Sequence, residues 1–282
     1  MVLSDTIDGV TDRVGFWPTE QGELFACLTV PRDCRGAVLM CPSLGTDLIA
    51  NYRREVKLSR LLATRGMATC RFHYRGTGHS DGDEAALTLG SMTTDARAMA
   101  RHVQEATGVN NISFLGARWG AIVALRTARA ASRGRLMWWD PLLDPGDYFL
   151  AGARISRFRD MLIGRAPGPS GDDILRDLAG GTPAHLLGHT FSAALWSSFR
   201  DDMPMDSGGV RLGGLRVCRF TACDSSPDDA APLPVAQLAD SVEAATTRQS
   251  GNWWLVEGDH NIDAGFLEEC ADWLGAGVEE SR

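Results

Sequence analysis

The sequence predicts an α/β fold, a mostly parallel, doubly wound sheet with an inserted helical lid. Two observations carry this prediction. Short apolar runs typical of buried strands alternate with longer segments whose apolar residues recur at helical spacing. From about residue 145 to residue 214 this alternation stops, and no clear strand pattern is seen. The alternating part therefore predicts a sheet with helices on both faces, and the interruption predicts a lid.

The expected core elements follow in chain order. The helix Thr88–Thr107, for example, has Met92, Ala96, Met99 and Val103 on one face. The expected strands are Val14–Trp17, Glu23–Val30, Ala37–Cys41, Met67–Phe72, Asn111–Leu115, Arg135–Trp139, Leu215–Thr221 and Trp253–Val256. The other expected helices are Leu48–Thr64, Trp119–Ala131, Val235–Ala245 and Phe266–Leu274.

The domain division follows from the interruption. We expect the core to span residues 1–144 and 215–282, and the lid to span residues 145–214. Within the lid, helical patterns cover Leu150–Ile163, Ile174–Leu178 and His185–Phe199, and segments rich in Gly, Pro and Ser separate them. A helical insertion between two strands of a sheet is typical of a lid over the strand ends.

Composition narrows the class of protein. A formal net charge of -8 argues against a nucleic-acid binder, which needs a basic surface. No apolar stretch is long enough to span a membrane, and because the first residues include Asp5 and Asp8 and lack an apolar run, we expect no signal peptide. Seven cysteines without a C-x-x-C motif indicate reduced thiols and a cytoplasmic protein. No cofactor is expected, and a homodimer is compatible with the sequence.

The segment Ile112–Ala121 has the pattern of a nucleophile elbow, which is a buried strand, a tight turn and a helix. The two outer glycines of G-x-S-x-G are present as Gly116 and Gly120, but Arg118 stands at the central position. A guanidinium does not attack a carbonyl, and it stays charged at any relevant pH. The sequence therefore predicts the frame of a hydrolase with an altered centre.

Polar residues also follow the carboxyl ends of the other predicted strands. In an open parallel sheet, ligands bind beyond these ends. The residues that arrive there with Arg118 are Ser43, Tyr74, Asp140, Asp224 and His260. A base, two acids and a positioned turn are thus expected to meet in one site.

These segments together resemble the α/β-hydrolase superfamily over nearly the whole chain, and within it the serine aminopeptidase-like and exosortase-associated hydrolases. Tyr74–Ser80 is similar to the D-x-R-G-x-G-x-S loop of that family, and Pro42–Gly45 matches its oxyanion loop. Gly258–His260 is similar to the late segment that supplies the catalytic histidine. The chain order of elbow, acid and histidine is also that of the family.

The resemblance implies that His260 is the base and that Asp224 holds it. Asp140 is the alternative acid, because some relatives place the acid on an earlier strand. The family has a serine where this chain has Arg118. Arg118 then either anchors a carboxylate or phosphate of a substrate, or pairs with Asp140 or Asp224 as a structural plug, or does both in turn.

Ser43 in the oxyanion loop is a candidate for a displaced nucleophile that uses His260. The simpler interpretation is that the loop only lines the pocket or offers backbone N–H groups to an oxyanion. We expect Leu44, Trp119, Asp140 and Tyr74 to contact the substrate, with core packing as the alternative for the tryptophan.

His185 and His189 have the spacing of metal ligands on one helical face. The glutamate of an H-E-x-x-H motif is missing, because position 186 is leucine. No metal site is therefore expected.

Three functional hypotheses follow. The first is an enzyme with a non-standard site, in which Arg118 holds an acyl or carboxylate-bearing small molecule and His260 moves protons in acyl-transfer, lyase or cyclase chemistry. The second is hydrolysis of an ester or thioester by Ser43 or by a water that His260 activates. The third is a catalytically inactive binding or scaffold protein.

Overall fold

The computed structural model describes residues 2–131, 134–201, 212–222, 235, 238–249 and 264–276. Within these residues, nine strands form one sheet in the order β1-β2-β3-β5-β4-β6-β7-β10-β11. Their bounds are β1 Val2–Ile7, β2 Val10–Thr19, β3 Gly22–Pro31, β4 Gly36–Cys41, β5 Met67–Phe72, β6 Ile112–Ala117, β7 Arg135–Trp139, β10 Gly214–Ala222 and β11 Val242–Gln249. Six neighbouring strands of this sheet run parallel to one another, namely β5, β4, β6, β7, β10 and β11. Strands β1, β2 and β3 add an antiparallel edge. The prediction of a mostly parallel sheet is confirmed.

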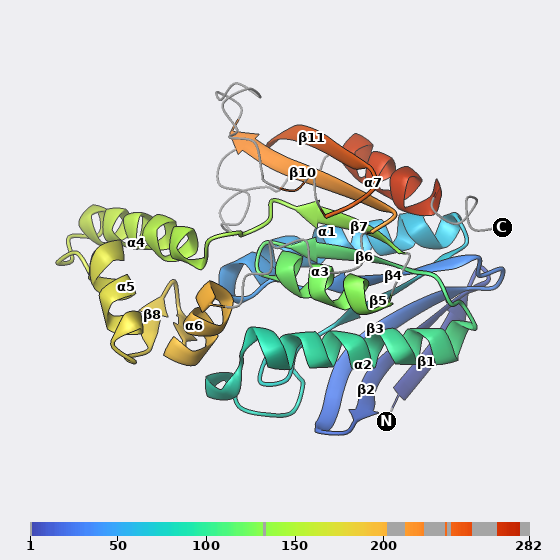
Figure 1. Ribbon diagram of the computed structural model, residues 1–282, viewed down its shortest axis with the longest axis horizontal. Helices are drawn as coiled ribbons and strands as arrows, with labels where there is room; N and C mark the ends of the chain where they lie inside the picture. Colours follow the sequence, from blue (N-terminus) through green and yellow to red (C-terminus); the bar gives the residue numbers. More distant parts are fainter. Residues whose placement is uncertain are drawn as a thin grey trace.

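Helices cover both faces of this sheet (Figure 1). Helices α1 (Gly45–Thr64) and α7 (Ala264–Ala276) pack together on one face, while α2 (Leu89–Thr107) and α3 (Gly120–Ala131) pack together on the other. A short 3₁₀ turn, η1 (Glu84–Ala86), precedes α2. Each face has its own buried apolar cluster. The doubly wound arrangement is thus confirmed.

Local sequence signals explain the central elements. Every residue of β4 is buried, as expected for a strand covered on both faces, and this accounts for its continuous apolar run. Helix α2 begins with a capping box, in which Thr88 and Ser91 satisfy each other's backbone N–H groups. The helix ends at Gly108, whose φ of 71° is the left-handed conformation that glycine adopts without strain.

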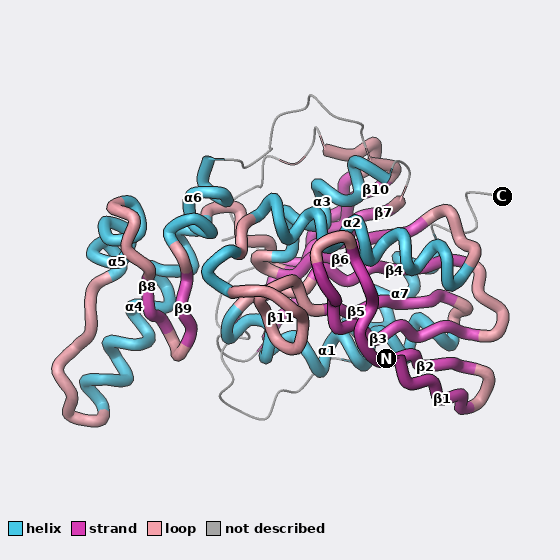
Figure 2. Tube along the Cα trace, turned by 90° about the horizontal axis from the view of Figure 1, so that it is seen from below, coloured by secondary structure: helices cyan, strands magenta, loops and turns pink. Residues whose placement is uncertain are grey.

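The segment between β7 and β10 holds α4 (Pro145–Leu162), α5 (Gly171–Ala179), β8 (Ala184–Leu186), β9 (His189–Phe191) and α6 (Ala193–Asp201). Figures 1 and 2 both place these elements at one end of the molecule, beside the sheet. We call this segment the cap. Its role as a lid, and the domain boundaries derived from the sequence, stay predictions.

The helix predicted for His185–Phe199 is wrong over its first half. The chain there forms the antiparallel pair β8 and β9, and only α6 is helical. Leu187 and Gly188 connect the two strands with φ angles of 50° and 84°. Two successive positive φ angles fit a tight hairpin turn, whose twist matches that of the paired strands.

Two further differences lie at the edges of the sheet. Strand β1 was not predicted from the sequence. Residues 242–245 were predicted to end a helix but belong to β11, which pairs in parallel with β10. Hydrogen bonds to the neighbouring strand outweigh the weak helical preference of this segment. The predicted strand Trp253–Val256 lies outside the described residues.

Among the described residues, no helix has the length and apolar character needed to cross a membrane.

Candidate functional site

The turn between β6 and α3 has the geometry of a nucleophile elbow. Arg118 has a φ of 50°, a conformation that residues other than glycine rarely adopt. The flanking glycines leave room for the turn. A Cβ atom on Gly120 would lie 2.1 Å from the carbonyl oxygen of Cys41, and one on Gly116 would lie 2.5 Å from the carbonyl oxygen of Gly120. Both positions therefore require glycine.

The side chain of Arg118 is 10% exposed and lies between two carboxylates. Its Nε donates a hydrogen bond to Oδ2 of Asp47 at 2.9 Å. Its Nη1 donates to Oδ2 of Asp140 at 3.2 Å. The predicted pairing with Asp140 is therefore present, and the predicted partner Asp224 lies outside the described residues.

Asp47 is the partner that the sequence did not reveal. It stands in the first turn of α1, and its side chain is fully buried. Burial raises the pKa of this carboxyl to about 6, although the adjacent Arg118 guanidinium lowers it. An acidic residue in the first turn of a helix normally interacts with the helix dipole, so this position gave no specific signal of an ion pair.

Asp140 is the more accessible of the two partners. It follows β7 directly, has a φ of 44°, and donates its backbone N–H to the carbonyl oxygen of Cys218 at 2.7 Å. Its side chain is 21% exposed, whereas that of Asp47 is not exposed at all. The ion pair between Arg118 and Asp140 is therefore easier to replace than the one between Arg118 and Asp47.

The electrostatics of the elbow favour an anion beside Arg118. Burial lowers the pKa of this guanidinium, but the carboxylates of Asp47 and Asp140 outweigh that effect and raise it. Helices α1 and α3 begin at Gly45 and Gly120, next to the oxyanion loop and the elbow. Helix N-termini stabilise negative charge. The guanidinium of Arg118 is thus a permanent cation at the elbow, and the carboxylates of Asp47 and Asp140 are its present partners.

The cap covers Pro42–Gly45, the segment that is similar to the oxyanion loop of the hydrolases. Ser43 is 1% exposed, and its Oγ makes no hydrogen bond to a described residue. Leu44 is 4% exposed and precedes α1 in an extended conformation. A Cβ atom on Gly45 would lie 2.8 Å from the hydroxyl of Tyr148 and 3.1 Å from the ring of Phe191. Residues of α4 and β9 therefore press directly on this loop.

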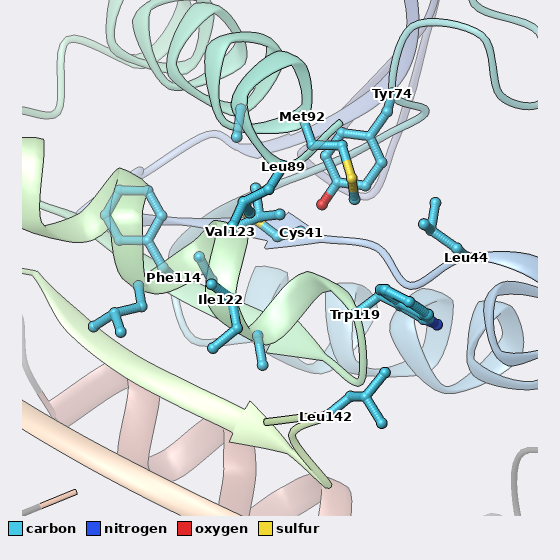
Figure 3. Close-up of a cluster of buried hydrophobic side chains, with 14 of the residues drawn as sticks. Cys41, Leu44, Tyr74, Leu89, Met92, Phe114, Trp119, Ile122, Val123 and Leu142 are labelled. Carbon is cyan, nitrogen blue, oxygen red and sulfur yellow. The ribbon is translucent and has the colours of Figure 1, made fainter. Parts of the chain in front are cut away.

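Trp119 joins the elbow to the cap. Its buried ring lies between Leu44 and Leu142 (Figure 3) and contacts four aromatic rings of the cap. These belong to Tyr148, Phe149, Phe191 and Phe199, with centroid distances from 4.9 to 6.2 Å. Tyr74 is also fully buried, and its hydroxyl points toward Cys41 (Figure 3). Tyr74 and Trp119 thus lie in the apolar core, and their contact with a substrate stays a prediction.

Phe199→Leu is expected to lower the free energy of unfolding by about 1–2 kcal/mol, because it removes the edge-to-face contact with Trp119. Phe199 is 1% exposed, and its ring stands at 89° to that of Trp119. Urea unfolding followed by far-UV circular dichroism measures the change. Phe158→Leu is the matched control, since Phe158 is 60% exposed. Equal effects of the two substitutions would contradict this role of the aromatic cluster.

His260 and Asp224, the base and acid implied by the resemblance, lie outside the described residues. His185 and His189 stand on the two strands of the β8–β9 hairpin, so the helical face proposed for them is wrong. In the part of the chain that the structure describes, no group of three or more His, Cys, Asp or Glu residues comes together as metal ligands do.

No protein-family model matches this chain, and no curated protein matches its sequence. Among solved structures, Est1E of Butyrivibrio proteoclasticus with bound ferulic acid is 15% identical, at a TM-score of 0.59 over 94% of this chain and 98% of that chain. A monoacylglycerol lipase of Paleococcus ferrophilus is 17% identical, at a TM-score of 0.57 over 90% and 99%. Mouse alpha/beta hydrolase domain-containing protein 10 is 15% identical, at 0.57 over 95% and 99%. With its parallel sheet, its two helical layers and its elbow, the chain has the α/β-hydrolase fold.

Proposed function

We propose that this chain is an enzyme on the α/β-hydrolase fold that binds an acyl or carboxylate-bearing small molecule and has no elbow nucleophile. Arg118 anchors the anionic group of the substrate. His260, supported by Asp224, transfers protons. Because proton transfer needs no covalent intermediate, this arrangement suits lyase, cyclase and acyl-transfer chemistry, as well as attack by an activated water on an ester or thioester.

The observation that carries this proposal is a guanidinium held at the elbow in a strained conformation. A positive φ at a residue such as arginine costs about 1–2 kcal/mol, and such strain is common at functional sites. The φ of 50° at Arg118 directs a long cationic side chain to the place where the hydrolase fold puts its reactive group. A planar guanidinium is well suited to bind a carboxylate with two parallel hydrogen bonds.

Substrate binding in this proposal exchanges one carboxylate for another. The fully buried Asp47 stays on Nε of Arg118 and keeps the side chain in place. The substrate carboxylate replaces the partly exposed Asp140 at Nη1, where the hydrogen bond is longer, at 3.2 Å. Since Asp140 competes with the substrate, its removal strengthens the binding of anions.

Asp140→Asn is therefore expected to tighten the binding of hexanoate by about tenfold, the equivalent of one lost competing ion pair. Isothermal titration calorimetry measures the affinity, and hexanamide is the uncharged control ligand. Asp147→Asn is the control variant, because Asp147 is a nearby carboxyl in the first turn of α4 but is not the partner of Nη1. Unchanged or weaker binding of hexanoate by Asp140→Asn contradicts the anchor.

A fluorophosphonate tests the remaining alternative, a displaced serine nucleophile. We expect no adduct by intact-protein mass spectrometry, because the elbow carries no hydroxyl. A single adduct on the wild type that disappears in both Ser43→Ala and His260→Ala would overturn the proposal in favour of Ser43 as nucleophile.

One observation favours a second candidate, a catalytically inactive binding protein. Arg118 is almost completely buried and already has two carboxylate partners, as expected for an ion pair with a purely structural role. On this alternative, Asp140→Asn changes stability without creating affinity for any carboxylate, and substitutions on the exposed cap surface impair the biological role. The hexanoate titration thus separates the two candidates.

A further inference from the structure

A cavity lies beside α1. It has a volume of about 340 Å³, and its walls come from α1, from strands β2, β3 and β5, and from Pro42 and His73, which follow β4 and β5. Val14, Phe25 and Leu48 give it an apolar wall. This volume lies at the lower end of the range found for small-molecule sites, which combine apolar walls with a few placed polar groups.

Glu55 is the first polar group of this cavity. It projects from α1, is only 3% exposed, and its Oε1 makes no hydrogen bond to any residue that the structure describes. Burial raises the pKa of Glu55 to about 7, while Arg71 acts in the opposite direction. Buried polar atoms in folded proteins nearly always have a hydrogen-bond partner, so Glu55 is a polar residue of the cavity lining that the described part of the chain leaves unsatisfied.

Arg71 is the second polar group of this cavity. It stands on β5, paired in register with Cys27 on β3, and its guanidinium lies over the ring of Tyr52 at 5.3 Å. Its Nε is buried and, within the described part of the chain, also lacks a hydrogen-bond partner. Arg60 adds a second guanidinium to the same lining. Glu55 and Arg71 thus line one cavity, and each has a buried polar atom without a hydrogen bond to a described residue.

The charges select the class of ligand. Two guanidinium groups, of Arg60 and Arg71, share the cavity with one carboxyl group, that of Glu55. The balance is positive at neutral pH, so the cavity attracts an anion and repels a cation. A protonated Glu55 also donates a hydrogen bond to an anionic oxygen.

We propose that this cavity binds a small organic acid, with its carboxylate on Arg71 and Arg60 and its apolar body against Phe25 and Leu48. Glu55 completes the site as a hydrogen-bond partner of the carboxylate. The inference goes beyond the proposed function, because neither Arg118 nor any other residue of the elbow takes part.

Cys27 provides a readout confined to this cavity. Its half-buried thiol lines the cavity, whereas the half-buried Cys34 does not. We expect 2-naphthoate to slow the alkylation of Cys27 by iodoacetamide in a saturable manner, as followed by peptide mass spectrometry. The alkylation of Cys34 should not change, and the uncharged 2-naphthamide should protect neither thiol. No protection of Cys27 by 2-naphthoate would overturn the proposal.

Variants test the charge assignment. Arg71→Met should weaken protection by 2-naphthoate at least about tenfold, since a charge-assisted hydrogen bond is lost. Glu55→Gln should bind 2-naphthoate at least as tightly as the wild type, because it removes a negative charge and keeps a donor. Arg60→Met, at an exposed position of α1, is the second variant if Arg71→Met does not fold. Weaker binding by Glu55→Gln together with unchanged binding by Arg71→Met would overturn the assignment.

The anion anchor at Arg118 and the organic-acid site in the cavity can be disproved independently of each other. Asp140→Asn acts on the elbow and should leave the protection of Cys27 unchanged. Stronger protection of Cys27 in Asp140→Asn would mean that 2-naphthoate binds at the elbow, and would overturn the cavity as a separate site.

Discussion

Replacing Arg118 with methionine is expected to lower the free energy of unfolding by about 3–5 kcal/mol at pH 8. The substitution keeps much of the apolar volume but leaves the fully buried carboxylate of Asp47 without its cation. Removing one member of a buried ion pair costs far more than the pair itself contributes, because the remaining charge is neither solvated nor compensated. The arginine is therefore needed for stability, whatever its role in binding.

The loss should depend on pH, and Asp47 determines the sign. Its pKa is already about 6 in the folded protein, above the ordinary 3.8, and removing Arg118 raises it further. A carboxyl whose pKa is raised by folding holds its proton in the folded state, so its contribution to stability is greatest below about pH 4 and decreases as pH rises through the folded pKa. The defect of Arg118→Met should therefore be much smaller at pH 5 than at pH 8.

Urea unfolding at pH 5 and pH 8 measures this effect. Arg154→Met is the control, because Arg154 is an exposed arginine of the cap. Asp47→Asn in the Arg118→Met background should recover much of the lost stability at pH 8, since no buried charge then remains. A defect that is equal at both pH values, or that Asp47→Asn does not relieve, contradicts an ion pair as the source of the effect.

Gly120→Ala is expected to prevent stable folding, with a loss of more than about 5 kcal/mol. The new Cβ would lie 2.1 Å from the carbonyl oxygen of Cys41 and 2.6 Å from that of Pro42. Both atoms belong to the backbone at the end of β4, so no side chain can move aside to relieve the overlap. Helix α3 and the oxyanion loop would have to separate, and the elbow would open.

Gly90→Ala is the matched control for this substitution. Gly90 lies in α2, and an added Cβ would meet only the hydroxyl of Thr88 at 3.7 Å. Alanine there should be neutral or should stabilise the protein by about 0.4–1 kcal/mol, because it reduces the freedom of the unfolded chain. The yield of soluble protein and its circular dichroism compare the two variants. A folded Gly120→Ala protein with wild-type stability would contradict the close approach of the elbow to β4.

The sequence predicted the frame of the molecule because its signals are local. The alternation of buried strands and amphipathic helices requires a sheet covered on both faces, and β4 to β7 follow that prediction closely. The spacing of Gly116 and Gly120 around Arg118 predicted the elbow, because only glycine fits where two backbone segments touch. These features depend on a few neighbouring residues and on the period of the pattern.

Contacts between distant residues were decided only by the tertiary structure. Asp47 and Arg118 are 71 residues apart, and nothing near either one shows that they pair in the interior. The hairpin of β8 and β9 and the edge strand β11 depend on partners that a helical pattern does not reveal. The same holds for the cavity with Glu55 and Arg71, since the buried carboxyl group of Glu55 becomes informative only when its surroundings are known. The sequence thus determined which residue stands at the elbow, while packing determined which charges surround it, because burial and pairing are properties of the folded chain.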